Sequence, residues 1–185
     1  KQKPAYEIYQ CDWSSDVCSS DLVMNLLGPC VNPARPPVQL LGVADPRLLR
    51  RIAQVLQALG VGQALVVHGS GLDEVALHAD TRAIRLVDGE LEELVLTPEE
   101  VGFERTALVA LEGGDPAVNA ARLKDLLEGS GSVAEQQAVS LNAGALLWTA
   151  GLASDFAQGC AKAMDVLRSG EAGRTLAAFV EASRG

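Results

Sequence analysis

The chain has 185 residues, of which 48% are hydrophobic and 21% are charged, so it is long enough for one domain with a sizeable core and too apolar for a disordered protein. Its formal net charge of −9 argues against nucleic acid or an anionic membrane as the main partner, since both require a basic surface. No apolar run approaches the roughly 20 residues of a membrane span, and no secretory signal follows the N-terminal lysines. The four cysteines show no CxxC motif and no disulfide-dense spacing. These features predict a globular cytoplasmic protein.

The first segment, residues 1–22, is predicted to be a translated leader that is foreign to the protein. Its stretch DWSSDVCSSDL back-translates into a nucleotide sequence that resembles a common short-read sequencing adapter, and the first residues fit the outer end of the same adapter in the same frame. A poorly ordered polar terminus is the ordinary alternative. On the adapter interpretation Cys11 and Cys18 have no function, the protein proper begins near Val23, and its own N-terminal part is missing.

The next predicted elements are a helix and a buried strand. Asp45 is a suitable N-cap, Pro46 suits the first helical turn, the apolar residues that follow recur every three or four positions, and Gly60 ends the helix. The run QALVVHG at residues 63–69 is short and continuously apolar, which is typical of a strand buried on both faces. A helix followed by a buried strand indicates a parallel α/β arrangement.

A hairpin and a short helix come after this strand. TRAIRLVDGELEELVL, residues 81–96, alternates around Asp88-Gly89, which is a strong signal for a β-hairpin. Residues 97–100 (TPEE) then combine a cap, a proline and an acidic first turn, and predict a short helix.

The remainder of the chain is predicted to be helical. Asp115-Pro116 starts one helix, Ser132 precedes a second, residues 154–170 form a third that ends at Gly170, and residues 171–183 form the last. No repeat or flexible linker interrupts them. We therefore expect residues 23–185 to form one piece of one α/β domain.

The most informative stretch for chemistry is VVHGSGLDE, which carries the predicted buried strand into a loop. Ligands of open α/β sheets collect at the carboxyl ends of strands, and Asp73 and Glu74 place two carboxylates there. Such a pair suits Mg²⁺ that also binds substrate phosphates, although spacing alone favours a solvated acidic pair in a turn. Gly69 and Gly71 suggest a phosphate loop only weakly, since a third glycine and a GK[ST] motif are both missing.

Other polar and sulfur-bearing residues have a structural explanation beside a functional one. His68 is a candidate general base, but a histidine at the end of a buried strand is more often hydrogen-bonded structure. Arg35 could hold an anion or pair with local carbonyls, and Asn142 is more suited to a packing or capping contact than to catalysis. The residues with no functional pattern around them are His78, Cys30 and Cys160, and the two cysteines are expected to be small buried hydrophobes.

Four stretches together resemble the C-terminal part of the anthranilate phosphoribosyltransferase family. They are NLLGPCVNPARPPVQLLGV, VVHGSGLDE, GGDPAVNAARLKDLLEG and LNAGALLWTAGLASDFAQGCAKAMDVLRSGEAGRTL. The resemblance covers residues 23–185 without a gap and departs from the usual pattern at Met24 and Cys30, where Phe and Leu are usual. It implies an α/β fold, namely a truncated C-terminal part of the α/β domain of the nucleoside phosphorylase and phosphoribosyltransferase type.

The resemblance also implies a reaction. Family members move phosphoribosyl from 5-phosphoribosyl diphosphate to the amino group of anthranilate in tryptophan biosynthesis, with Mg²⁺ neutralising the departing diphosphate, and they are usually homodimers. The family's Asp-Glu metal site falls on Asp73 and Glu74. Its glycine-rich diphosphate loop and its anthranilate-binding arginine lie upstream of NLLGP, so neither catalytic nor substrate-binding residues are assigned in this chain. We therefore expect the 185-residue polypeptide to be inactive by itself and only marginally folded.

Two other interpretations have specific points against them. A pyrimidine-nucleoside phosphorylase shares the fold but uses phosphate without a metal-bound diphosphate leaving group, so the LDE carboxylates disfavour it. A non-catalytic nucleic-acid-binding paralogue needs a basic groove, which the net charge of −9 opposes.

The leader hypothesis makes a prediction about stability. Deletion of residues 1–22 removes no packed structure if they are foreign, so the thermal unfolding midpoint of the shortened chain should be unchanged or raised. Melting both chains by circular dichroism measures this, and a clear fall in the midpoint would show that the leader contributes to the fold.

Overall fold

The computed structural model describes Cys30 and residues 32–184 of the chain. Contacts divide the chain into two units, 1–35 and 36–185. The predicted leader lies outside the described residues. Of the first unit, the described part includes a turn in which the backbone N–H of Arg35, at a φ of 44°, donates to the carbonyl of Asn32.

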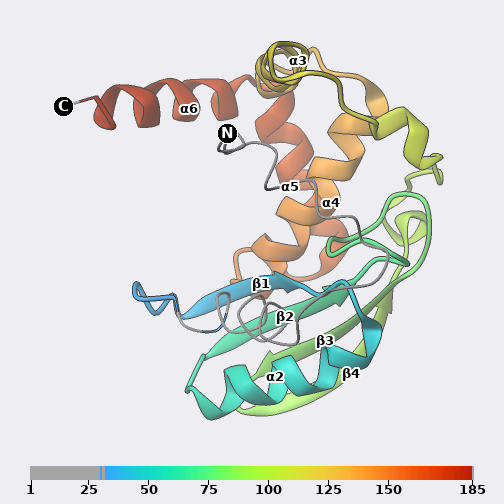
Figure 1. Cartoon of the computed structure of the whole chain (residues 1–185), viewed down its shortest axis with the longest axis vertical. Helices are drawn as coiled ribbons and strands as arrows, with labels where there is room; N and C mark the ends of the chain where they lie inside the picture. The colour runs from blue at the N-terminus through green and yellow to red at the C-terminus, as the bar shows by residue number, and fades with distance from the viewer. Residues whose placement is uncertain (1–29, 31, 185) are drawn as a thin grey trace, which may run out of the picture. The chain divides into compact units, whose positions relative to one another are not determined.

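The second unit is a sheet covered by helices, drawn in Figure 1. In chain order its elements are β1 (Val38–Gly42), the 3-10 helix η2 (Pro46–Leu48), α2 (Leu49–Ala58), β2 (Gln63–His68), β3 (Thr81–Val87), β4 (Glu90–Leu96), the 3-10 helices η3 (Pro98–Val101) and η4 (Leu108–Leu111), α3 (Pro116–Leu127), α4 (Val133–Thr149), α5 (Phe156–Arg168) and α6 (Glu171–Ala182).

The sheet has four strands in the order β1-β2-β3-β4. β1 and β2 are parallel, with Leu40 opposite Leu65, whereas β3 is antiparallel to both β2 and β4. The carboxyl ends of β1 and β2 therefore meet at the same edge as the start of β3 and the end of β4. The β3–β4 turn lies at the opposite edge and has Asp88 at φ 50° and Gly89 at φ 79°, as the Asp-Gly pair predicts.

Both faces of the sheet are covered, which explains the continuously apolar β2. Helix α2 packs on one face against β2 and β3, and α4 packs on the other against β1 and β2. Alternate β2 residues contribute to each side, so Leu65 and Val67 join the core beneath α4 and α5. Residues 64–67 are at most 1% exposed, which confirms the prediction of a strand buried on both faces.

Helices α4 and α5 approach each other so closely that their backbones touch. A Cβ built on Gly144 would lie 2.4 Å from the backbone nitrogen of Cys160, and one on Gly159 would lie 2.3 Å from the carbonyl oxygen of Gly144. Only glycine fits at these two positions unless the helices separate. Beside this contact, Cys160 is 1% exposed, which confirms the expectation of a small buried hydrophobe, and burial raises the pKa of its thiol to about 12.

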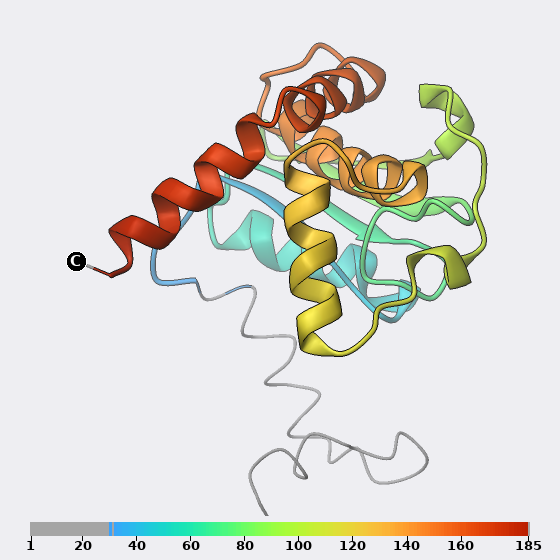
Figure 2. The same ribbon diagram turned by 90° about the horizontal axis from the view of Figure 1, so that it is seen from above.

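The ends of the helices follow the local signals in the sequence. Ser132 and Glu135 form a capping box at the start of α4, Thr97 and Glu100 form another at η3, and Asp155 caps α5. The short helix predicted at residues 97–100 is a 3-10 turn. At the other end of the chain, α6 starts near the end of α3, diverges from both α3 and α5, and buries none of its residues (Figure 2).

The helix contact generates a stability prediction. Gly144→Ala and Gly159→Ala should each lower the free energy of unfolding by about 1–3 kcal/mol, because the overpacking cost exceeds the roughly 1 kcal/mol that alanine gains in helix propensity. Urea unfolding of the 185-residue chain measures this. Gly62→Ala is the matched control, since a Cβ there would lie at an ordinary 3.5 Å from the Pro37 carbonyl oxygen. Equal losses in the control and either helix variant would contradict the proposed crowding.

Candidate functional site

Asp73 and Glu74 lie in the loop between β2 and β3, at the sheet edge where both parallel strands end. Both side chains are exposed, whereas residues 75–77 directly after them are buried. The loop therefore presents the two carboxylates to solvent on a backbone that is anchored in the core.

Two glycines at the strand ends hold this backbone. A Cβ on Gly42, the last residue of β1, would lie 1.6 Å from the carbonyl oxygen of Asp73. A Cβ on Gly69, just after β2, would lie 2.3 Å from the carbonyl oxygen of Glu74. Each acidic residue thus has its carbonyl pressed against a glycine Cα, in space that any other residue type would fill.

His68 closes the turn at the end of β2. Its Nδ1 lies 2.8 Å from the Val43 carbonyl oxygen, and its Nε2 lies 3.3 Å from the backbone nitrogen of Gly71, which donates to it. These contacts assign the proton to Nδ1 and use the lone pair of Nε2. At 8% exposure His68 is hydrogen-bonded structure, so the general-base alternative is not supported.

Asn142 of α4 binds the backbone of Val75, the residue that follows the acidic pair. Its Oδ1 accepts from the Val75 N–H at 2.9 Å, and its Nδ2 donates to the Val75 carbonyl at 3.0 Å. The next amide, that of Ala76, donates to the hydroxyl of Thr81 at 2.8 Å. The expectation of a packing contact rather than catalysis is confirmed for Asn142, although the sequence did not indicate its partner.

An ion-pair cluster braces the far end of the loop. Arg105 bonds to Glu99 at 2.6 Å and also pairs with Asp80. The guanidinium holds the pKa of Glu99 below its usual value. Ser70 donates to the Asp80 carbonyl, and the Nε2 of His78 lies 3.4 Å from the Ser70 carbonyl, which agrees with a structural role for that half-buried histidine.

The nearby carboxylate of Asp45 has a structural role. It caps η2 by accepting from the backbone N–H of Arg47, and it pairs with the guanidinium of the same residue at 2.6 Å. Hydrogen bonds from Arg47 lower the pKa of Asp45 to about 2.

Within residues 32–184 and Cys30, no group of three His, Cys, Asp or Glu side chains is placed to hold a metal ion. Asp73 and Glu74 therefore suit a cation such as Mg²⁺ only if other oxygens, for example those of a substrate phosphate, complete its coordination.

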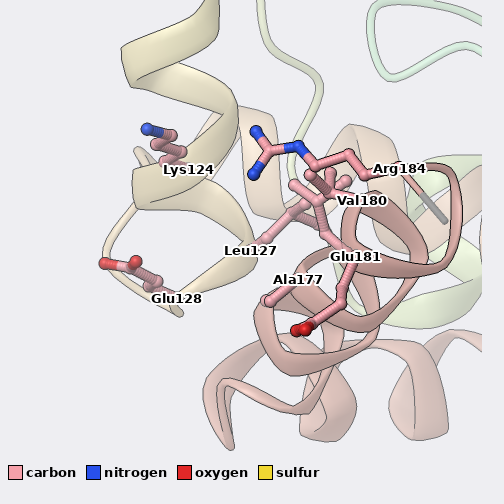
Figure 3. Close-up of a pocket in the computed structure, with 9 residues that line it drawn as sticks. Lys124, Leu127, Glu128, Ala177, Val180, Glu181 and Arg184 are labelled. Carbon is pink, nitrogen blue, oxygen red and sulfur yellow. The ribbon is translucent and has the colours of Figure 1, made fainter.

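A cavity of about 820 Å³ lies elsewhere, between α3 and α6. Its lining is apolar at Leu127, Ala177 and Val180 and charged at the rim, as Figure 3 shows. The lining residues belong to α3, α6 and the ends of those helices, and none comes from the β2–β3 loop.

No described helix is both long and apolar enough to cross a membrane.

Residues 19–173 match the family model described as "Glycosyl transferase family, a/b domain", and the chain therefore belongs to this glycosyl transferase family. Its relatives carry a more specific name. The chain is 53% identical over 162 residues to an anthranilate phosphoribosyltransferase of Sorangium cellulosum (strain So ce56), covering 88% of this chain and 47% of the relative. It is 49% identical over 150 residues to that of Shewanella sp. (strain MR-4), covering 81% of this chain and 43% of the relative.

Solved structures with the same name have the same fold. Anthranilate phosphoribosyltransferase from Thermus thermophilus superposes with a TM-score of 0.82 at 42% identity, over 88% of this chain and 48% of that one. The Saccharomyces cerevisiae enzyme in complex with PRPP and Mg gives 0.78 at 26% identity, over 86% and 46%. The α/β fold class predicted from the sequence is confirmed, and the chain spans about half the length of the relatives it matches. The matched range begins inside residues 1–22, and the leader hypothesis stays a prediction.

The geometry of His68 predicts that its loss affects stability. His68→Ala should lower the free energy of unfolding by about 1–3 kcal/mol, because the buried Val43 carbonyl loses its donor. Urea unfolding checks this, with His78→Ala as the control, since the ring of His78 contacts the Ser70 carbonyl at a long 3.4 Å. If both variants lost the same stability, the bracing role of His68 would be wrong.

Proposed function

We propose that this chain is the C-terminal part of an enzyme that transfers phosphoribosyl from 5-phosphoribosyl diphosphate to the amino group of anthranilate, in tryptophan biosynthesis. The observation that carries the proposal is the Asp73–Glu74 pair, exposed at the carboxyl edge of the sheet on a glycine-clamped backbone. It occurs in a chain that is 53% identical to an anthranilate phosphoribosyltransferase.

In this proposal Asp73 and Glu74 hold Mg²⁺ together with the diphosphate of the substrate. The bound ion supplies positive charge to the leaving diphosphate. The chain itself contributes two hard anionic ligands at a fixed position, because the carbonyls of both residues abut glycines and cannot shift toward the strands. Fixed ligands spare the reorganisation that mobile ones would require in the transition state.

Support for the substrates comes from the relatives. One solved Saccharomyces cerevisiae structure is described as a complex with PRPP and Mg, and another as a complex with 4-fluoroanthranilate. Both share 26% identity with this chain. By the sequence resemblance, the remaining substrate contacts belong to the N-terminal half of the family's enzymes, so we assign no catalytic residue here.

The two alternative functions have less support. A pyrimidine-nucleoside phosphorylase does not need a paired carboxylate for a metal-bound diphosphate, and the relatives named above are phosphoribosyltransferases. A nucleic-acid-binding protein would need a basic groove, against the net charge of −9. We further propose a cytoplasmic location and a homodimeric whole enzyme, both from the resemblance. The inactivity of the 185-residue chain by itself also stays a prediction.

The proposal is tested by removing both carboxylates in the whole enzyme of which this chain is proposed to be a part. Asp73→Asn combined with Glu74→Gln should lower the turnover rate at limiting Mg²⁺ on the order of 100-fold, since a metal ion contributes several kcal/mol of transition-state stabilisation and 1.36 kcal/mol is a factor of ten. Steady-state rates across a Mg²⁺ titration measure the effect.

The control removes the same two charges from the opposite edge of the sheet. Asp88→Asn with Glu90→Gln lies at the β3–β4 turn, where both residues are exposed. This variant should keep the wild-type Mg²⁺ dependence. Wild-type rates for the Asp73–Glu74 variant at limiting Mg²⁺ would refute the metal assignment.

A further inference from the structure

Asn142 makes a cyclic pair of hydrogen bonds with the backbone of Val75, the residue that follows the acidic pair. The two residues are separated by 67 positions, and both bonds have ordinary lengths, 2.9 and 3.0 Å. A third bond of 3.1 Å joins Nδ2 to the carbonyl of Ala138, one turn earlier on α4. The carboxamide therefore uses its acceptor and its donor group at once, with its orientation fixed by its own helix.

One of these bonds, the one from the Val75 N–H, is on the same peptide group that Gly69 touches. The peptide between Glu74 and Val75 has its carbonyl oxygen against the Cα of Gly69 and its N–H on Asn142. The preceding peptide has its carbonyl, that of Asp73, against Gly42. The carbonyl of the Glu74–Val75 peptide is thus held at the end of β2, and its N–H is held by helix α4.

Asparagine is specifically suited to this position. Val75 is 3% exposed, so its N–H and carbonyl have little access to water and need partners within the protein. Aspartate offers an acceptor but, when ionised, no donor, and leucine offers neither. Leucine leaves the N–H of the Glu74–Val75 peptide unpaired. Aspartate still accepts from that N–H, but it leaves the Val75 carbonyl without a donor and places a negative charge against it, so either replacement loosens the backbone that follows Glu74.

We propose that Asn142 is a positioning residue of the metal site, which sets the direction of the Glu74 carboxylate through the Glu74–Val75 peptide. This inference rests on the proposed role of Asp73 and Glu74 as Mg²⁺ ligands. It adds that helix α4 determines the geometry of ligands that lie in a distant loop.

The test uses the full 185-residue chain and two variants of Asn142. Mn²⁺ binding with and without inorganic diphosphate, followed by electron paramagnetic resonance, should be at least 10-fold weaker for both Asn142→Leu and Asn142→Asp. The aspartate variant is decisive because its added negative charge alone would tighten cation binding. Asn142→Asp should therefore weaken Mn²⁺ binding if Asn142 positions the ligands, and should tighten it if only the added charge matters.

Thr149→Val on the same helix is the matched control. Thr149 is 2% exposed and donates to the Ala145 carbonyl at 2.7 Å, so this variant also loses a buried hydrogen bond but leaves the loop untouched. All three variants should lose stability, whereas Thr149→Val should keep wild-type Mn²⁺ affinity. Unchanged or tighter binding by the Asn142 variants would overturn the inference.

Hydrogen exchange separates this inference from the proposed function. In the metal-free chain the Val75 amide should exchange at least 10-fold faster in Asn142→Leu than in Thr149→Val, and equal rates would overturn the positioning role whatever the metal does. The Asp73→Asn, Glu74→Gln chain should lose Mn²⁺ binding. If it bound Mn²⁺ like the wild type, the carboxylates would not be the metal ligands and the proposed function would fail instead.

Discussion

The backbone contact between Gly144 and Gly159 sets the spacing of α4 and α5, and both the core and the loop at the sheet edge depend on α4. The helix covers one face of the sheet and contributes Leu141 and Ala145 to the main core. A helix pair separated by ordinary side chains would lie farther apart and would displace every residue that α4 sends toward the sheet. The two missing Cβ atoms therefore matter as much for the loop at the sheet edge as for the helices themselves.

The acidic pair and the neighbouring Asp45 show how environment separates carboxylates that look alike in sequence. Asp45 is bound by Arg47, which lowers its pKa to about 2 and occupies its oxygens. Asp73 and Glu74 project from a rigid backbone into solvent. At this edge of the sheet two carboxylates therefore face solvent without an ion pair in the described structure, whereas the charge of the third is neutralised by Arg47.

The sequence predicted those parts of the fold that depend on neighbours along the chain. The Asp-Gly turn and the helix starts at Asp115-Pro116 and after Ser132 are local signals, and the structure confirms each of them. β1 was not predicted, because a five-residue strand after a proline-rich segment has no distinctive period. The candidate site was located from the loop that follows β2 and from the family resemblance. The clamp by Gly42 and the partner of Asn142 were not foreseen, since a single sequence carries no sign of which residues meet after folding.

The bond between Asn142 and Val75 also bears on the order in which the molecule folds. Closing a loop costs more chain entropy as the loop lengthens, so the β3–β4 hairpin can form early, whereas the 67-residue connection to Asn142 closes late. During synthesis the Asp73–Glu74 loop leaves the ribosome well before α4 has been made. Its strands can pair while the loop itself is still open on one side. The backbone of Val75 gains its partner on α4 only when that helix docks, so the loop that carries Asp73 and Glu74 is fixed by a part of the chain that is made long after it.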